Sequence, residues 1–142
     1  MDADRFEVTF GIAPSDLMER AVEYRARAYA PYSGFLVGAA ILIEGGNIIG
    51  GCNVENASYG MTLCAERVAM ANAVASGFSA PLAIAVAAAP GVFCPPCGAC
   101  RQFLSEFNPR LAVVLMNGAE YEIYGLDDLL PRNFSLRGVS DD

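Results

Sequence analysis

The sequence predicts an α/β domain with a mixed sheet. Segments with helical spacing alternate with short apolar runs typical of buried strands, which is the pattern of a layered α/β fold. Turn sequences at 45–47 and 117–118 each join two neighbouring strand candidates as a hairpin, so part of the sheet is expected to be antiparallel. With 142 residues, 54% of them hydrophobic, the chain is long enough to bury one core without disulfides.

The first half of the chain is predicted to contain two helices and a hairpin. The first helix is expected over 14–30, because a proline and an acidic first turn precede apolar residues at helical spacing. Apolar runs at 35–44 and 48–56, separated by a Gly-Gly-Asn turn, predict the hairpin. The second helix is expected over 64–77, where the last residue is a glycine of the kind that ends helices.

The second half of the chain adds three strands and two short helices. The continuous apolar run at 82–89 predicts a central strand. The segment 97–107, entered through two prolines, predicts a short helix. An Asn-Gly pair then joins strands predicted at 111–117 and 120–124. A last short helix is expected near 126–131.

The whole chain, 1–142, is expected to form a single domain, since it contains no repeat and no long linker. Residues 1–13 are expected to be a loosely specified lead-in. The last residues, 138–142, are expected to form a flexible acidic tail.

Composition and charge exclude several classes of protein. The net charge is −7, and the nine arginines form no basic cluster, so no nucleic-acid partner is expected. The longest apolar run, Leu82 to Ala89, is far shorter than the roughly 20 residues that cross a bilayer, so no membrane partner is expected. The N-terminus lacks the apolar stretch of a secretory signal. The expected location is therefore the cytoplasm, where stable disulfides are rare, and five cysteines cannot all pair.

Three cysteines in two segments have the pattern of a metal site. Cys97 and Cys100 are three residues apart at the start of a predicted helix, so they face the same side. Cys64 begins the other predicted helix of the site, and helix N-termini favour thiolates. Three sulfur ligands suit a tetrahedral zinc whose fourth position is open to a water molecule. Glu66, two residues after Cys64, is placed to carry that water's proton.

The sequence resembles the zinc-dependent deaminases. Its CAE at 64–66, followed 33 positions after the cysteine by PCxxC, matches the pattern of a zinc site made of three cysteines, with a glutamate that is not a ligand. Five blocks resemble the small homotetrameric cytidine deaminases: PYSGFLVGAA, GCNVENASYG, LCAER, PCGACRQFL and LLPRNF. The resemblance covers nearly the whole chain and implies a cytidine-deaminase-like three-layer α/β/α sandwich around a mixed five-stranded sheet.

The resemblance also implies a role for each site residue. The three cysteines would bind one Zn²⁺ per subunit, and Glu66 would move protons while cytidine and deoxycytidine are deaminated to uridine and deoxyuridine in pyrimidine salvage. Arg67 would bond to the cysteine sulfurs and offset their negative charge. The nucleoside would be bound by Phe35, Asn53, Glu55, the backbone at Ala65 and, from neighbouring subunits of a homotetramer with shared active sites, Tyr59 and Phe134.

The residues alone are compatible with other interpretations of the cysteines. The three thiols are compatible with burial in a core, and Cys97 and Cys100 with a redox pair, because CxxC also occurs in thioredoxin-like proteins. Cys94 forms a second CxxC with Cys97. The two prolines between them supply no amide donors to sulfur, so Cys94 is expected to lie near the site without replacing Cys100. Cys52 is expected in the core.

Three alternative functions use the same residues. The first is deamination of another aminopyrimidine, as in blasticidin-type deaminases or enzymes of free bases; Asn53 and Glu55, as readers of a sugar, argue against it. The second is nucleic-acid editing, which the net charge of −7 disfavours. The third is a zinc-stabilised binding module without activity, which would require a fourth protein ligand such as Cys94.

Overall fold

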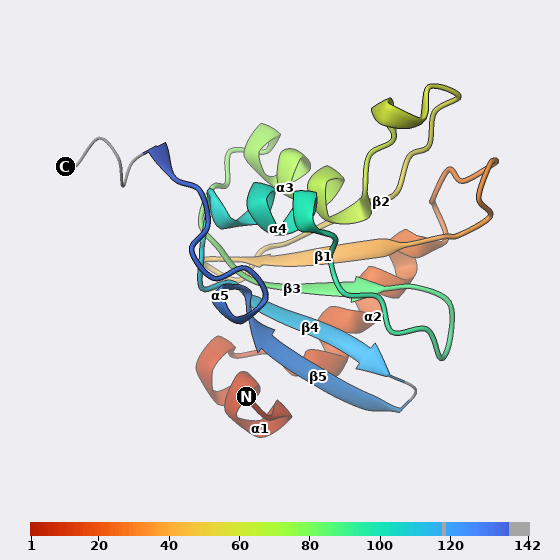
Figure 1. Ribbon diagram of the computed structural model, residues 1–142. Helices are drawn as coiled ribbons and strands as arrows, with labels where there is room; N and C mark the ends of the chain where they lie inside the picture. Colours follow the sequence, from red (N-terminus) through yellow and green to blue (C-terminus); the bar gives the residue numbers. More distant parts are fainter. Residues whose placement is uncertain (118, 137–142) are drawn as a thin grey trace.

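The computed structural model describes residues 1–117 and 119–136 and contains one five-stranded mixed sheet. The strands are β1 (Gly38–Ile43), β2 (Ile48–Cys52), β3 (Pro81–Ala87), β4 (Ala112–Asn117) and β5 (Glu120–Gly125), in the order β2-β1-β3-β4-β5. β3 and β4 are parallel, and the other neighbouring pairs are antiparallel (Figure 1). The five predicted strands and the mixed sheet are therefore confirmed.

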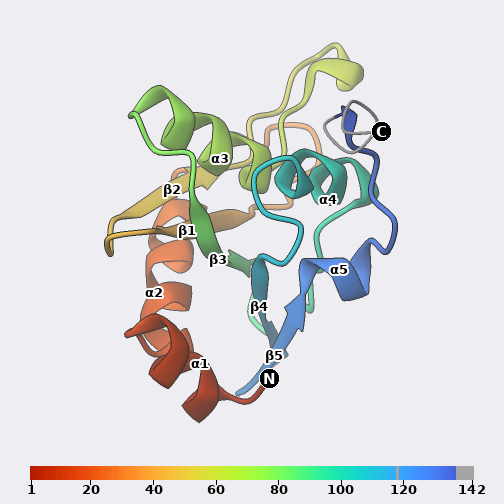
Figure 2. The ribbon, with the colours of Figure 1, turned by 90° about the vertical axis from the view of Figure 1, so that its left-hand side faces the viewer.

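Helices cover both faces of this sheet and produce three layers. α2 (Pro14–Arg25) lies on one face, and α3 (Ala65–Ala75) and α4 (Gly98–Ser105) lie side by side on the other (Figures 1 and 2). The short α5 (Leu126–Leu129) follows β5. The three-layer α/β/α prediction is confirmed. Within the described residues, no helix is long and apolar enough to cross a membrane.

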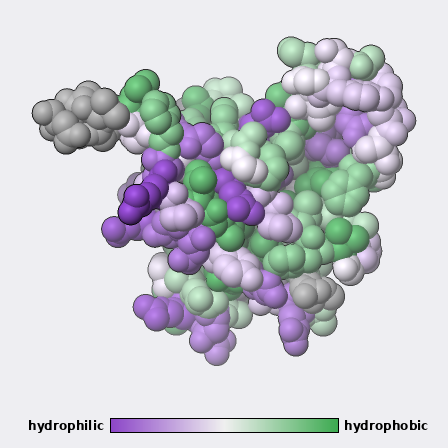
Figure 3. All heavy atoms as spheres, in the orientation of Figure 1, coloured by the Kyte–Doolittle hydropathy of each residue, from purple (hydrophilic) through white to green (hydrophobic). Residues whose placement is uncertain are grey.

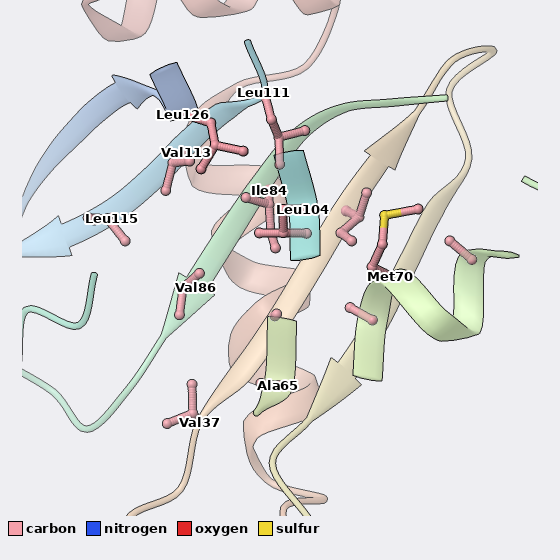
Figure 4. Close-up of a cluster of buried hydrophobic side chains, with 14 of the residues drawn as sticks. Val37, Ala65, Met70, Ile84, Val86, Leu104, Leu111, Val113, Leu115 and Leu126 are labelled. Atoms are coloured by element: carbon pink, nitrogen blue, oxygen red, sulfur yellow. The ribbon is translucent and has the colours of Figure 1, made fainter. Parts of the chain in front are cut away.

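Each face of the sheet carries its own buried cluster, because side chains of a strand alternate between the two faces. The cluster under α3 and α4 joins Met70 and Leu104 of the helices to alternate residues of the central strands, such as Ile84 (Figure 4). The cluster on the opposite face joins Leu17 and Ala21 of α2 to the intervening strand positions. The α3–α4 layer, which carries the predicted site residues, is thus fixed to the sheet by its own core.

Two glycines let the helices approach the sheet closely. A Cβ atom on Gly38 of β1 would lie 2.0 Å from the carbonyl oxygen of Ala21 in α2. A Cβ atom on Gly51 of β2 would lie 2.4 Å from the backbone nitrogen of Ala69 in α3. Helix backbone therefore occupies the space that a larger residue at either position would need.

The predicted elements are present, but the first helix and the first hairpin are shorter than expected. The helix predicted over 14–30 ends at Arg25, and Tyr29 forms an isolated bridge with Val54 instead. The second strand, predicted to reach residue 56, ends at Cys52. The side chain of Asn53, the next residue, binds the backbone of Phe35 and Val37, just before β1. Cys52, expected in the core, is half-buried at this strand end.

The first thirteen residues, expected to be a loosely specified lead-in, contain the helix α1 (Ala3–Phe10). Asp2 caps its start by accepting a hydrogen bond from the amide of Arg5, and Gly11 ends it with a positive φ of 74°. Phe6 is fully buried in the cluster beside α2, and its ring lies 4.7 Å from that of Phe10. The lead-in prediction was wrong because it overlooked these local signals and the packing of Phe6.

Two expectations fall on residues outside those that the structure describes. The predicted acidic tail, 138–142, is one, and Gly118 of the predicted Asn-Gly turn is the other. The hairpin itself is confirmed by the pairing of Asn117 with Glu120 across β4 and β5.

Candidate metal centre and substrate pocket

Three thiols meet where two helices begin. Cys64 is the N-cap residue of α3, Cys97 is the N-cap residue of α4, and Cys100 lies in the first turn of α4. Their sulfur atoms all lie within 4.8 Å of one another, and those of Cys97 and Cys100 are 3.4 Å apart. Tetrahedral zinc with Zn–S bonds of about 2.3 Å places its sulfur ligands roughly 3.8 Å apart. Among residues 1–117 and 119–136, no other group of His, Cys, Asp or Glu gathers in this way.

The chemistry of these donors fits a divalent cation. Burial opposes ionisation of Cys97, but hydrogen bonds from Cys100 and Cys64 hold the pKa of Cys97 below its ordinary value. Burial and the negative charge of Glu66 raise the pKa of Cys100 well above its ordinary value. Three thiolates beside a carboxylate repel one another unless a cation compensates them, and zinc supplies that compensation.

Glu66 lies in the first turn of α3 and is 5% exposed. Burial raises the pKa of this carboxyl, although its own backbone amide, Cys100 and Arg67 act in the opposite direction. A carboxyl with a raised pKa exchanges protons near neutral pH more readily than an exposed one. The side chain thus has the properties of a general acid and base.

Arg67 approaches the metal-binding group from the side of α3. Its Nη2 atom lies 3.8 Å from the sulfur of Cys64 and donates a hydrogen bond of 3.2 Å to the carbonyl oxygen of Thr62. The hydrogen bond to Cys64 raises the pKa of the guanidinium further, so the positive charge is permanent. The predicted approach of Arg67 to a cysteine sulfur is present in the structure, while its effect on a bound metal stays a prediction.

A cavity of about 190 Å³, here called the inner cavity, is lined by Cys64, Cys97 and Glu66, while Cys100 lies buried. Phe35, Asn53 and Ala65, all predicted from the sequence, line it. Its wall also contains residues to which the sequence analysis gave no role in substrate binding: Val37, Thr62, Leu63, Cys94 and Pro95. Cys94 carried a signal, its place in the cysteine-rich segment, and lies near the site as expected. The other four are ordinary small or apolar residues with no chemical signature.

A second concavity of about 380 Å³, here called the outer hollow, adjoins the inner cavity at Thr62, which lines both. Glu55 and Tyr59, two further predicted residues, line the outer hollow together with Tyr32 and Ser33. The sequence prediction therefore placed its candidates in two connected spaces rather than in one.

Hydrogen bonds to the backbone hold the two predicted sugar readers in place. The Oδ1 atom of Asn53 accepts a hydrogen bond of 2.9 Å from the amide of Val37, and its Nδ2 atom donates one of 2.8 Å to the carbonyl oxygen of Phe35. Asn53 therefore fixes the segment that carries Phe35. Glu55 accepts hydrogen bonds from the amides of Tyr32 and Ser33 and from the Ser33 hydroxyl.

Phe134 lies apart from both spaces of its own chain. It lines neither the inner cavity nor the outer hollow and is 64% exposed. Together with Leu136, which is 69% exposed, it forms part of the hydrophobic surface near the C-terminal end (Figure 3). The described chain thus places every predicted site residue except Phe134 at the metal-binding group or in one of these two spaces. Tyr59, whose predicted role belongs like that of Phe134 to a neighbouring subunit, lies in the outer hollow of its own chain.

The chain matches a known protein family over most of its length. The family model described as the cytidine and deoxycytidylate deaminase zinc-binding region matches residues 13–116. A cytidine deaminase of Halalkalibacterium halodurans is 42% identical over 127 residues, which cover 88% of this chain and 96% of the relative. A cytidine deaminase of Sporosarcina psychrophila is 44% identical over 126 residues, which cover 87% of this chain and 93% of the relative.

Solved structures give the same result for the fold. The crystal structure of cytidine deaminase from Burkholderia pseudomallei superposes with a TM-score of 0.82 at 45% identity, covering 87% of this chain and all of that one. Cytidine deaminase from Mycobacterium tuberculosis superposes with a TM-score of 0.76 at 41% identity, covering 86% of this chain and 97% of that one. The layered fold is thus shared with these relatives.

Proposed function

The chain belongs to the cytidine and deoxycytidylate deaminase family, and on this premise we propose how its residues share the hydrolysis of cytidine. The family carries out zinc-dependent deamination of cytidine in pyrimidine salvage, and this chain is a hydrolase of that kind. We extend the substrate to deoxycytidine, with uridine or deoxyuridine and ammonia as products.

Cys64, Cys97 and Cys100 would hold one zinc ion per subunit, as their spacing and charge support. Zinc bound there would supply a Lewis acid that lowers the pKa of a water molecule. Three thiolates oppose that effect by their negative charge. The guanidinium of Arg67 beside Cys64 and the N-termini of α3 and α4 partly compensate it.

Glu66 would be the proton carrier of the reaction. It takes one proton of the attacking water and passes it to N3 of the cytosine ring. It then moves the water's second proton, from the hydroxyl group formed at C4, to the amino group, which departs as ammonia while C4 becomes a carbonyl. In the net reaction, one cytosine nucleoside and one water molecule give one uracil nucleoside and one molecule of ammonia. Burial in the wall of the inner cavity, which raises the pKa of Glu66, supports this role.

The residues around the inner cavity would orient the nucleoside. Phe35 would pack against it, and the backbone at Ala65 would bind the edge of the pyrimidine. Asn53 keeps one amide hydrogen beyond its bond to Phe35, and Glu55 keeps acceptor capacity in the outer hollow, so both would bind sugar hydroxyls.

Neighbouring subunits would complete the site. Phe134, exposed and outside its own chain's cavity, and Tyr59, which is 76% exposed, would reach the pocket of adjacent chains in a homotetramer. We place the enzyme in the cytoplasm, where reduced cysteines are available to bind zinc. Gel filtration or light scattering checks the assembly, which would have about four times the mass of the 15.0 kDa chain.

The observation that carries the proposal is the grouping of the Cys64, Cys97 and Cys100 sulfur atoms at a cavity that buried Glu66 also lines, together with Cys64 and Cys97. Loss of cytidine absorbance on addition of the zinc-loaded protein tests it, with a Glu66→Gln variant alongside. We expect that variant to bind zinc normally and to lose about 10²- to 10⁴-fold in kcat. Wild-type turnover in the variant would contradict the role of Glu66.

A further inference from the structure

A single glutamine side chain binds both peptide groups of Phe134. The Nε2 atom of Gln102, in α4, donates a hydrogen bond of 2.9 Å to the carbonyl oxygen of Phe134. Its Oε1 atom accepts one of 3.2 Å from the amide of Phe134. The side-chain amide thus pairs with the backbone as a neighbouring strand would, across a separation of 32 residues.

Arg101, the residue before Gln102, joins the same two parts of the chain. Its Nε atom donates a hydrogen bond of 2.8 Å to the carbonyl oxygen of Pro96, next to Cys97. Its Nη1 atom donates one of 2.8 Å to the carbonyl oxygen of Leu129, at the end of α5. The C-terminal segment runs beside α4 in both ribbon views (Figures 1 and 2). The cysteine-bearing loop, α4 and the C-terminal segment are therefore tied into one unit.

The orientation of Phe134 is not fixed by packing of its own side chain. Its side chain is 64% exposed and belongs to neither buried cluster, so core packing does not fix its direction. Its backbone is instead held at two points by Gln102. Two hydrogen bonds to one residue restrict both its position and its rotation, whereas a single bond would leave rotation free.

We propose that Gln102 is a positioning residue that aims Phe134 at the nucleoside site of a neighbouring subunit. This inference rests on the proposed function, in which Phe134 contributes to that site. Gln102 itself touches neither substrate nor metal. Because it lies on the helix that carries Cys100, it sets the direction of Phe134 from the same rigid element that holds the metal ligands.

The main test is a Gln102→Met variant, which keeps the length of the side chain but removes both hydrogen bonds. We expect KM for cytidine to rise about 3- to 10-fold, since each neutral hydrogen bond contributes a factor of this order. Turnover at saturation, zinc content and melting temperature are expected to stay near wild type. Hydrogen exchange of the Phe134 amide is expected to accelerate, because its acceptor is gone.

A double-mutant cycle with Phe134→Ala shows whether Gln102 acts through the phenylalanine. We expect Phe134→Ala to raise KM by itself and Gln102→Met to add little in that background. The positioning role is wrong if the increases in KM caused by the two substitutions multiply in the double variant. It is also wrong if Phe134→Ala raises KM while Gln102→Met leaves it unchanged. In both cases the proposed function stands. If Phe134→Ala leaves KM unchanged, the predicted contribution of Phe134 fails, and the role of Gln102 fails with it.

Two further variants separate positioning from a general effect on α4. Gln102→Glu keeps the acceptor for the Phe134 amide but replaces the donor to its carbonyl oxygen with a second acceptor. It is expected to keep the slow amide exchange and still raise KM. Ser105→Ala is the matched control, because it removes a hydrogen bond of 2.8 Å within the same helix, to the carbonyl oxygen of Gln102, without touching Phe134. An equal rise in KM in that control would overturn the proposal.

Discussion

Hydrogen bonds from Ser33 lower the pKa of Glu55 in the outer hollow. The Ser33 hydroxyl and its backbone amide both donate hydrogen bonds to the carboxylate, and together with the amide of Tyr32 they lower the pKa of Glu55 despite a small opposing effect of burial. A carboxylate that is already ionised offers both oxygens to donors, as the binding of sugar hydroxyls requires. The pKa of Glu55 thus depends on a neighbour, Ser33, that the sequence motif does not include.

The first prediction concerns this pair. We expect Ser33→Ala to raise the pKa of Glu55, because the largest stabilising contact of the carboxylate is lost. The pKa of Glu55 is lower in the folded protein than in the unfolded chain, so ionised Glu55 stabilises the folded protein at pH values above the unfolded-state pKa. This stabilisation disappears as the pH falls through the folded-state pKa. In the variant, protonation of Glu55 should therefore begin at a higher pH. Titration of the side-chain carboxyl carbon by NMR, with Tyr32→Phe as a control that keeps the Tyr32 amide, measures the change. An identical titration curve in Ser33→Ala would contradict it.

Cys94 is the thiol that does not join the other three. It lines the inner cavity, but its sulfur is not part of the group whose atoms lie within 4.8 Å of one another. Burial, and after it the negative charges of Glu66, Cys64 and Cys97, raise the pKa of Cys94. The pKa of Cys100 is raised as well, so it is the position of Cys94 outside the group of three sulfur atoms that sets it apart.

The second prediction follows from this arrangement. We expect Cys94→Ser to bind one zinc ion per subunit and to keep kcat within about a factor of 3 of the wild-type value, because a serine of similar size makes no new ligand. Cys97→Ser is the matched comparison and should lose most of its zinc. Metal analysis of both proteins decides the question. Loss of zinc in the Cys94 variant would make Cys94 the fourth ligand and would favour a closed, structural metal site.

At the scale of whole elements, the contact between β2 and α3 controls the position of the site. Gly51 faces the backbone of Ala69, and α3 carries Glu66 and Arg67 in its first turn, directly after Cys64. Any displacement of α3 away from the sheet would move these residues relative to α4. The distance between the two helix starts is thus set partly by a glycine that touches no ligand.

The third prediction is a Gly51→Ala variant. The added Cβ atom would lie 2.4 Å from the backbone nitrogen of Ala69, so α3 must move. We expect the free energy of unfolding to fall by about 2 kcal/mol or more and zinc affinity to fall with it. Gly60→Ala is the control, because nothing lies within 4 Å of its added Cβ. Urea unfolding and metal competition measure both effects; equal stability of the two variants would show that α3 can adjust without cost.

Some of the helices, strands and contacts could be predicted from the sequence, and others could not. Strands at 82–89 and 111–117 were predictable because continuous apolar runs are characteristic of strands buried on both faces. The shared side of Cys97 and Cys100 was predictable because their spacing is a local property of a helix start. That Cys64 joins them was implied by the resemblance to the deaminases, and the three sulfur atoms are grouped in the structure. The helix α1 was missed although Asp2 and Gly11 are local signals of its two ends, because so short a helix also depends on burial of Phe6 against elements far along the chain. The pairing of Gln102 with Phe134 has no local signature at all.

At the scale of the whole molecule, the metal centre and the two cores are separate sources of stability. The sheet carries a buried cluster on each face, and neither consists of metal ligands. The centre sits at the edge of one layer, between the starts of α3 and α4. We therefore expect the fold to persist when the metal is removed, with local loosening around the thiols.

The fourth prediction is the outcome of chelation. We expect far-ultraviolet circular dichroism to remain near that of the zinc-bound protein and the melting temperature to fall, since a ligand of the native state stabilises it by mass action. Thiol-reactive dye should label Cys97, which is exposed, before half-buried Cys64, and buried Cys100 last. Complete loss of secondary structure on chelation would show instead that the metal holds the entire fold.

The two attachment points of the metal also bear on how the chain reaches its native state. Cys64 and Cys97 are separated by 33 positions that contain α3 and β3, so a metal bound to both closes a loop around one helix and one strand. In polymer terms such a closure removes conformational entropy from the unfolded ensemble, by about 3 to 4 kcal/mol for a covalent link of this span. A nascent chain that acquires its metal early would thus search fewer conformations. Metal supply during synthesis would then influence the yield of folded enzyme as well as its activity.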